Sequence, residues 1–261
     1  MFQRKMAVSM VAVLALCAAA LMAPAATKEE PPAKANAAAR AETPSKAGDA
    51  AKAKARRPDP AMATVEDAAN LPRVLLIGDS ISIGYTVAVR ELLKGKANVH
   101  RPPTNCASTL VGLKSLEAWL GDKKWDVIHF NWGLHDLKYI DEKGALVAVD
   151  KGKQQVPLDE YVKNLRQLVQ QLKKTGAKLI WCATTPVPEG AAGRVPGDEV
   201  KYNEAAARVM KESGVETDDL YAFAKPKLKD IQQPRNVHFT AEGSRQLAQV
   251  VADTIQKALS R

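Results

Sequence analysis

Residues 71–261 alternate short apolar runs, rich in β-branched residues, with longer amphipathic stretches. This alternation is typical of a parallel sheet whose connecting helices cover both faces. We predict strands at residues 73–78, 97–101, 125–131, 177–185 and 215–223. The sequence therefore predicts an α/β fold, a three-layer α/β/α sandwich around a doubly wound, mainly parallel sheet of five strands.

The helices are expected between these strands. In residues 158–174 large apolar side chains recur at spacings of three and four, and Gly176 follows as a stop signal. Similar stripes predict helices at 84–94, 112–120, 199–213 and 240–259. Residues 137–157 are polar and punctuated by glycine, so we expect a β-hairpin excursion there. Ligands bind at the carboxyl ends of strands in open α/β sheets, so this excursion is expected to border the site.

The N-terminal 26 residues predict export. A basic start precedes an apolar stretch and small residues at Ala23 and Ala25, which together are typical of a signal peptide. We therefore expect a secreted or periplasmic protein with no stable membrane insertion after cleavage. Two alternatives stay open. The apolar stretch is near the lower limit for an uncleaved membrane anchor, and Cys17 permits a lipoprotein, although Leu16 is bulky for the position before a lipidated cysteine.

Residues 27–70 consist mainly of Ala, Pro, Lys and Glu, and they contain no aromatic residue. Such a segment cannot bury enough apolar surface to offset its ordering entropy. We predict a disordered tether over 27–70, leading to one catalytic domain at 71–261.

The charge and the cysteines exclude several classes of protein. The formal net charge is +9 at pH 7, but the basic residues are spread along the chain without the interleaved aromatics of a nucleic-acid groove. A solvated surface, or weak attraction to anionic polysaccharide or lipid, fits better. Beyond the signal peptide only Cys106 and Cys182 remain, too few for a disulfide framework or a zinc cluster. We expect a monomer with no nucleic-acid partner, no metal and no cofactor.

Three polar clusters follow strands or precede helices. Ser80 lies in "LLIGDSISIGY" (75–85), directly after the first strand; "FNWGLHD" (130–136) follows the third; and His238 lies in "RNVHFTAEG" (235–243), before the last helix. Alone, Ser80 is better explained as the N-cap of a helix. In a doubly wound sheet, however, the three clusters converge.

Together these clusters resemble the SGNH, or GDSL-type, hydrolase family, whose fold is flavodoxin-like. The resemblance spans residues 71–261, and its blocks occur in the family's order. The first block of the family is Gly-Asp-Ser, the third is Gly-x-Asn-Asp, and the last is a histidine before the final helix. They are matched by Gly78, Asp79 and Ser80; by Gly133, Leu134, His135 and Asp136; and by His238. The glycine of the second block corresponds to Ala107 or, failing that, to Gly112.

The resemblance implies the role of each matching residue. Ser80 is the nucleophile and His238 the general base, because a serine hydroxyl needs an imidazole to accept its proton during attack. The N–H groups of Ser80 and Ala107 and the side chain of His135 form the oxyanion hole. A neutral imidazole donates one hydrogen bond, so His135 can replace the usual Asn; a purely structural role is the alternative. Gly78, Asp79, Gly133 and Asp136 support the motif.

The acid of the family's triad is missing. Arg235 stands three residues before His238, where the family has Asp. Asn236 is expected to orient the imidazole through its carbonyl oxygen, although another residue could supply the acid. Cys106 lacks a cysteine-hydrolase motif, and His100 and His129 are expected in the core or behind the site.

These features predict a serine esterase that works through an acyl-enzyme on Ser80. The expected substrates are O-acetyl or other short-chain esters on carbohydrate, either a small molecule or a polysaccharide. The alternatives are a lysophospholipase or short-chain lipid esterase, an acyltransferase that uses the same residues, and a catalytically impaired module that binds polysaccharide.

Overall fold

The computed structural model describes residues 59–260, and within them a central sheet of five parallel strands. The strand order is β2-β1-β3-β6-β7, so the chain winds outward from β1 in both directions. This confirms the predicted doubly wound sheet. The strands are β1 (Arg73–Ile77), β2 (Asn98–His100), β3 (Val127–Phe130), β6 (Lys178–Cys182) and β7 (Glu216–Asp218).

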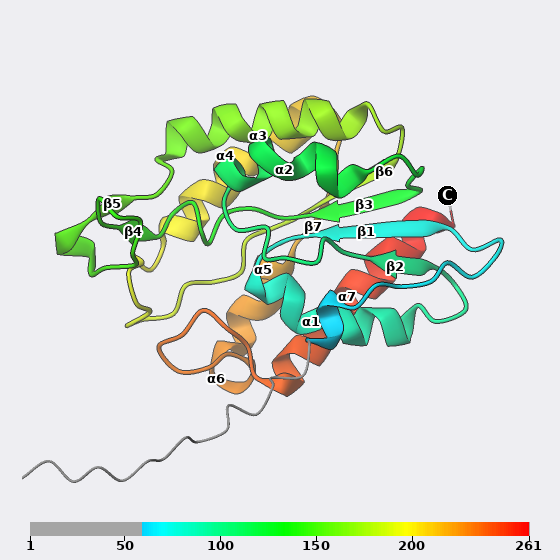
Figure 1. Ribbon diagram of the computed structural model, residues 1–261. Coiled ribbons are helices and arrows are strands. Elements are labelled where there is room, and N and C mark those ends of the chain that lie inside the picture. Colours follow the sequence, from blue (N-terminus) through cyan, green and yellow to red (C-terminus); the bar gives the residue numbers. More distant parts are fainter. Residues whose placement is uncertain (1–58, 261) are drawn as a thin grey trace, which may run out of the picture. The chain divides into compact units, whose positions relative to one another are not determined.

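Helices cover both faces of this sheet, which confirms the three-layer sandwich (Figure 1). One face carries α2 (Thr109–Leu120), α3 (Leu158–Lys173) and α4 (Asp198–Ser213), and the other carries α1 (Ser80–Leu92) and α7 (Ala241–Leu259). Short helices complete the second face and the loops: α5 (Leu220–Ala224), α6 (Leu228–Ile231) and the 3-10 turns Pro60–Met62, Val149–Lys151 and Lys225–Lys227.

Burial on both faces explains why the central strands read as unbroken apolar runs. Residues 74–77 of β1 are at most 1% exposed, and β3 is buried throughout. On α3 the predicted stripe, which includes Tyr161, Leu165 and Leu172, packs into the same core. Full burial of each large apolar side chain contributes about 1.5–3 kcal/mol to the free energy of folding. The strands are thereby held in register, and their carboxyl ends meet at one edge of the sheet.

The last predicted strand is too long. The strand expected over 215–223 ends at Asp218, and helix α5 begins at Leu220. The reason is Asp219, whose carboxylate accepts the Ala222 N–H at 2.9 Å and so caps the helix.

The expected hairpin excursion is present. Strand β4 (Tyr139–Ile140) pairs antiparallel with β5 (Lys153–Gln154). The Tyr139 N–H also donates to the Gly193 carbonyl at 2.7 Å, which joins the hairpin to the loop between β6 and α4. In Figure 1 the arrowheads of β1 and β3 point toward the end of the molecule that carries this hairpin.

The tether prediction is wrong at its C-terminal end. Residues 59–70 lie against the domain: Asn98 exchanges hydrogen bonds with the backbone of Ala68 at 2.9 and 3.0 Å, and Asp67 accepts from His100 at 2.6 Å. Arg90 donates to the Pro60 carbonyl at 2.9 Å. Polar partners on α1 and β2 hold this segment, in which Ala61 is buried and Met62 and Val65 are partly exposed, and composition alone does not reveal these partners. The signal peptide and residues 27–58 lie outside the described residues.

Between residues 59 and 260, no helix has both the length and the apolar character that crossing a membrane requires.

Candidate active site

The structure brings the first and last polar clusters into contact. Ser80 is the first residue of α1, and His238 lies in the loop before α7. The Ser80 Oγ and the His238 Nε2 are 2.8 Å apart, although 158 positions separate the two residues in the sequence. This is the distance at which an imidazole accepts the proton of a hydroxyl.

Asp79, and not Ser80, caps helix α1. The Asp79 carboxylate accepts the Ile81 N–H at 2.9 Å, so the Ser80 side chain is free to face His238. As the first helical residue, Ser80 also has an N–H without an intrahelical acceptor. The hydroxyl and this N–H therefore stand together at the positive end of the helix dipole.

Asn236 sets the orientation of the His238 ring. Its Oδ1 lies 2.7 Å from the His238 Nδ1, and it also accepts the His238 N–H at 3.1 Å. The Asn236 Nδ2 donates to the Gln233 Oε1 at 3.2 Å, and this bond favours the amide orientation with its oxygen toward the ring. Nδ1 then carries the proton and Nε2 presents a lone pair to Ser80. Sequence reasoning missed Gln233, which no motif marks.

No acid takes the place of Asn236. Within residues 59–260 the ring nitrogens of His238 have only Asn236 and Ser80 as hydrogen-bond partners. Arg235 is exposed and has a left-handed φ of 57°, with its side chain lying against Gly190. The arrangement is a serine and a histidine held by a neutral amide.

His135 faces the same cleft, in its neutral form. The Lys138 ammonium donates to the His135 Nδ1 at 3.4 Å, so the ring proton resides on Nε2. Burial lowers the pKa of His135, and the nearby cations Lys138 and Arg194 lower it further against the opposing effect of Asp79. His135 thus offers one hydrogen-bond donor at neutral pH.

Ala107 occupies the kind of position that favours glycine. Its φ is 47°, in the left-handed region, which fits the glycine of the family's second block. Its N–H is not free, however, because it donates to the Asn105 Oδ1 at 2.9 Å. Asn105, which no sequence motif marks, lines the cleft. The fallback Gly112 lies within α2, where a Cβ would come within 2.8 Å of the Trp132 ring, and it has no place in the site.

Asp136 links the third block to the second. Its carboxylate accepts the Thr109 N–H at 2.8 Å and the Thr109 hydroxyl at 2.5 Å, so it caps helix α2 directly after the loop of Ala107. Burial raises the pKa of Asp136 to about 7. Gly133 allows a close approach, since a Cβ there would lie 2.1 Å from the Thr184 hydroxyl. Both residues shape the site without lining it.

Arg101, which the sequence also did not mark, braces the turn at Gly78. It is 8% exposed, and its guanidinium donates to the Gly78 carbonyl at 3.3 Å, to the Thr104 carbonyl at 3.1 Å and to the Thr86 hydroxyl at 3.0 Å. Gly78 is itself required, because a Cβ would lie 2.7 Å from that of Ser82. One buried cation thus fastens the nucleophile turn to the loop of the second block.

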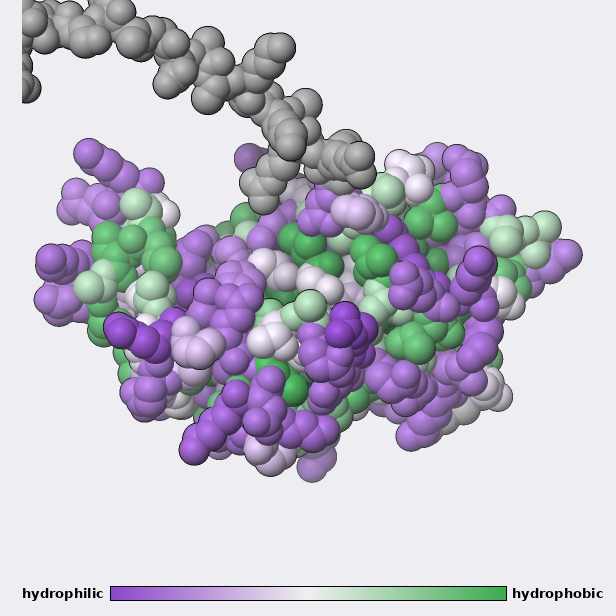
Figure 2. Space-filling view, turned by 90° about the horizontal axis from the view of Figure 1, so that it is seen from below, coloured by the Kyte–Doolittle hydropathy of each residue, from purple (hydrophilic) through white to green (hydrophobic). Residues whose placement is uncertain are grey.

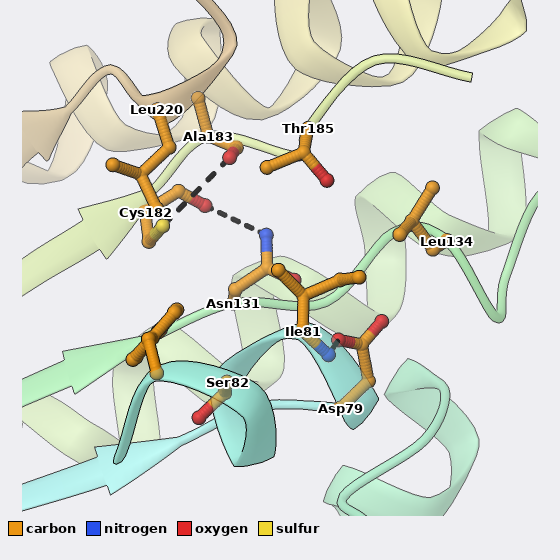
Figure 3. A pocket seen from close by; sticks show the side chains of 10 residues that line it. Asp79, Ile81, Ser82, Asn131, Leu134, Cys182, Ala183, Thr185 and Leu220 are labelled. Carbon is orange, nitrogen blue, oxygen red and sulfur yellow. Dashed lines mark hydrogen bonds between the residues drawn. The ribbon is translucent and has the colours of Figure 1, made fainter. Parts of the chain in front are cut away.

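Two spaces adjoin the nucleophile turn. An open cleft of about 430 Å³ contains Ser80, His238 and His135. On the other side of Asp79 and Leu134 lies a separate cavity of only about 10 Å³, with walls that include Ile81 and Leu220 (Figure 3). The smaller space has about the volume of one water molecule. Substrate therefore has room only in the open cleft.

The remaining candidates do not line the cleft. Burial raises the pKa of the Cys106 thiol to about 11, which disfavours the thiolate that a nucleophile needs. The His129 Nε2 lies 2.9 Å from the Asp218 carboxylate, deep in the sheet beside Cys182. His100 bonds Asp67 at the sheet edge, away from the cleft lining.

The family model of GDSL-like lipases and acylhydrolases matches residues 76–246. The chain belongs to this family. Members of the GDSL/SGNH class are hydrolases that act on esters. The matched region runs from β1 into α7 and so contains Ser80, His135 and His238.

Individual GDSL relatives are distant. A GDSL esterase/lipase of Arabidopsis thaliana is 36% identical over 78 residues, which cover 30% of this chain and only 32% of the plant protein. An acetyl xylan esterase structure matches with a TM-score of 0.57 at 18% identity, over 70% of this chain and 99% of the other. The acetylxylan esterase of Geobacillus stearothermophilus matches with 0.58 at 19%, over 70% and 94%. A lipase/acylhydrolase of Enterococcus faecalis matches with 0.58 at 19%, over 72% and 96%. These structures share the fold.

The left-handed φ of Ala107 predicts a stabilising substitution. An L-residue there costs about 1–2 kcal/mol, so Ala107→Gly is expected to raise the free energy of unfolding by about 1 kcal/mol, measured by urea denaturation. The control Ala207→Gly, at an exposed position within α4, should lower it by about 1 kcal/mol. A loss of stability in both variants would contradict a strained Ala107.

The lowered pKa of His135 predicts a pH-dependent stability. Below a pH of about 6.5 the unfolded chain takes up a proton on His135, whereas the folded protein does so only at lower pH. Acid therefore favours unfolding, by at most about 1.4 kcal/mol per pH unit. Relative to His135→Asn, the wild type should lose stability as the pH falls from about 7.5 to about 5. Parallel stability curves for the two proteins would refute the lowered pKa.

Proposed function

We propose that this GDSL-family hydrolase is a secreted serine esterase that removes short acyl groups, above all O-acetyl, from carbohydrate. The observation that carries the proposal is the 2.8 Å contact between the Ser80 Oγ and an imidazole whose tautomer Asn236 sets. This contact lies in an open cleft at the carboxyl edge of the sheet. Export rests on the signal peptide that residues 1–26 predict.

Acylation follows from the positions of Ser80 and His238. The Ser80 oxygen attacks the acyl carbonyl while the His238 Nε2 takes its proton, and the tetrahedral oxyanion accepts hydrogen bonds from the Ser80 N–H and the His135 Nε2–H. The intermediate then collapses, and His238 returns the proton to the departing sugar alkoxide. Water attacks the acyl-enzyme by the same steps in reverse and releases the carboxylic acid and free Ser80.

Ala107 can donate to the oxyanion only when its N–H no longer donates to Asn105. The Ala107 N–H points to the Asn105 Oδ1 in the free protein, so substrate must share or displace that bond to gain a third oxyanion donor. Each such donor is worth about 3–4 kcal/mol of transition-state stabilisation. We assign the Ser80 N–H and His135 as the primary donors.

The space around Ser80 supports a short acyl group. Behind Asp79 and Leu134 only about 10 Å³ is open, so a long chain would have to extend along the open cleft, which Lys138, Arg194 and Arg235 line. The acetylxylan esterases that share this fold support carbohydrate as the alcohol component.

A panel of acyl esters tests the proposal. The wild type should release acetate from p-nitrophenyl acetate and from acetylated glycans, and it should turn over p-nitrophenyl octanoate at least about tenfold more slowly. Ser80→Ala should lower kcat by at least about 10³-fold. Ser115→Ala, on α2, serves as the matched control.

Two outcomes would replace the proposal. A faster reaction with octanoate would favour the lipid esterase. Glycan binding by a wild type that releases no acetate would favour the polysaccharide-binding module.

The neutral amide of Asn236, which orients His238, predicts that a carboxylate at this position increases activity. Asn236→Asp places a carboxylate where Oδ1 now contacts the ring, which stabilises the imidazolium that forms in the transition state. We expect kcat/KM toward p-nitrophenyl acetate to rise about tenfold. Lower activity in a folded Asn236→Asp variant would mean that Asn236 does not orient the base.

A further inference from the structure

Three cationic side chains line the cleft beside Ser80 and His238. They are Lys138, Arg194 and Arg235, which we term the cationic rim. Lys138 follows the third block, Arg194 lies in the loop between β6 and α4, and Arg235 precedes His238 in the sequence. Separate segments of the chain thus direct positive charge to one cleft.

The cationic rim has no acidic partner. Among residues 59–260 none of its members forms a salt bridge, and the acid that lines the cleft, Asp79, is engaged in capping α1. The Arg194 Nε donates to the Leu134 carbonyl at 3.0 Å and its Nη1 to the Ala192 carbonyl at 3.2 Å. Its Nη2 has no acceptor among residues 59–260. Among the described residues the protein therefore supplies hydrogen-bond acceptors to the rim but no direct ion pair, and Asp79 and Asp136 act on Arg194 and Lys138 only from beyond salt-bridge distance.

Two of the three cations differ from ordinary solvated surface groups. Arg194 and Lys138 are partly buried, and burial lowers the pKa of both side chains, which shows that the charged forms are desolvated. Desolvation of an unpaired charge is unfavourable unless an anion balances it. Free cations that converge on a site at such a cost are typical of anion recognition.

We propose that the cationic rim binds a carboxylate or sulfate group on the sugar that carries the acyl ester. The substrate is then an acylated acidic polysaccharide, an inference that rests on the proposed esterase function. Guanidinium groups suit both anions, because their planar fork matches two acceptor oxygens at once. Arg235 gains a role here: at the position where the family has an acid, it adds a cation beside the general base.

An anionic phospholipid headgroup is the competing ligand, and the surface argues against it. On the side of the molecule that carries α1, α6 and α7, apolar residues form small groups separated by hydrophilic ones (Figure 2). The cavity next to the cleft is too small for an acyl chain. The rim therefore fits a charged polysaccharide better than a lipid.

Binding without turnover tests the proposal. With the Ser80→Ala protein, Kd is measured by calorimetry for oligogalacturonate, for a sulfated galactan oligosaccharide, for a neutral xylo-oligosaccharide and for phosphatidylglycerol vesicles. At least one charged oligosaccharide should bind at least about tenfold more tightly than the neutral one, and salt should weaken its binding. The carboxylate and sulfate arms tell the two anions apart.

Variants of the rim locate the effect. Added to Ser80→Ala, Arg235→Gln should weaken binding of the charged oligosaccharide about tenfold, as expected for one charge-assisted hydrogen bond. Arg235 is exposed, so this variant should fold even if Arg194→Gln does not. Lys163→Gln, at an exposed position of α3, is the matched control and should change nothing.

The proposal is overturned if neutral and charged oligosaccharides bind alike, if Lys163→Gln weakens binding as much as Arg235→Gln, or if only the vesicles bind. Failure of the esterase is a separate result. If the wild type hydrolyses no ester yet binds the acidic oligosaccharide through Arg235, the esterase function falls and anion binding stands.

Discussion

The site depends on the parallel pairing of β1 with β2 and β3. Because all three strands run in one direction, each delivers the residues that follow it to the same edge of the sheet. Ser80 follows β1, Asn105 follows β2 and His135 follows β3. Helix α7 packs beside α1 on one face of the sheet, and the loop before α7 places His238 at this edge. The winding of the chain reverses at the same edge.

Buried polar contacts turn this coarse convergence into a defined geometry. Arg101 ties the Gly78 carbonyl to the loop after β2, and Asp136 caps α2 at the end of that loop. Both groups are buried, where losing a hydrogen bond is costly and those that are made restrict the geometry; Asp136 makes its bonds through Oδ1, while its Oδ2 has no partner among the described residues. The nucleophile turn and the second-block loop are therefore positioned by residues that never face substrate.

The departures from the family pattern are coordinated. Asn236, held by Gln233, takes over the orientation of the base from the missing acid, and Lys138 keeps His135 in the tautomer that donates from Nε2. With Arg235 in place of the acid, the cleft becomes more positive. The change from an acid to Arg235 removes a negative charge from beside His238 and adds a cation to the cleft. This change links the altered chemistry of the base to the proposed choice of substrate.

The sequence by itself determined the three layers and the doubly wound parallel sheet, and it pointed to Ser80, His135 and His238, because burial periodicity and short motifs are local properties of the chain. Only the tertiary structure decided that Asp79 caps α1, that Asn105 occupies the Ala107 N–H, that Gly112 is a packing residue and that 59–70 join the domain. It likewise selected Gln233, Arg101 and the cationic rim. These features are hydrogen bonds and charge juxtapositions between segments distant in the chain, and no local pattern of apolar residues encodes which polar groups will meet.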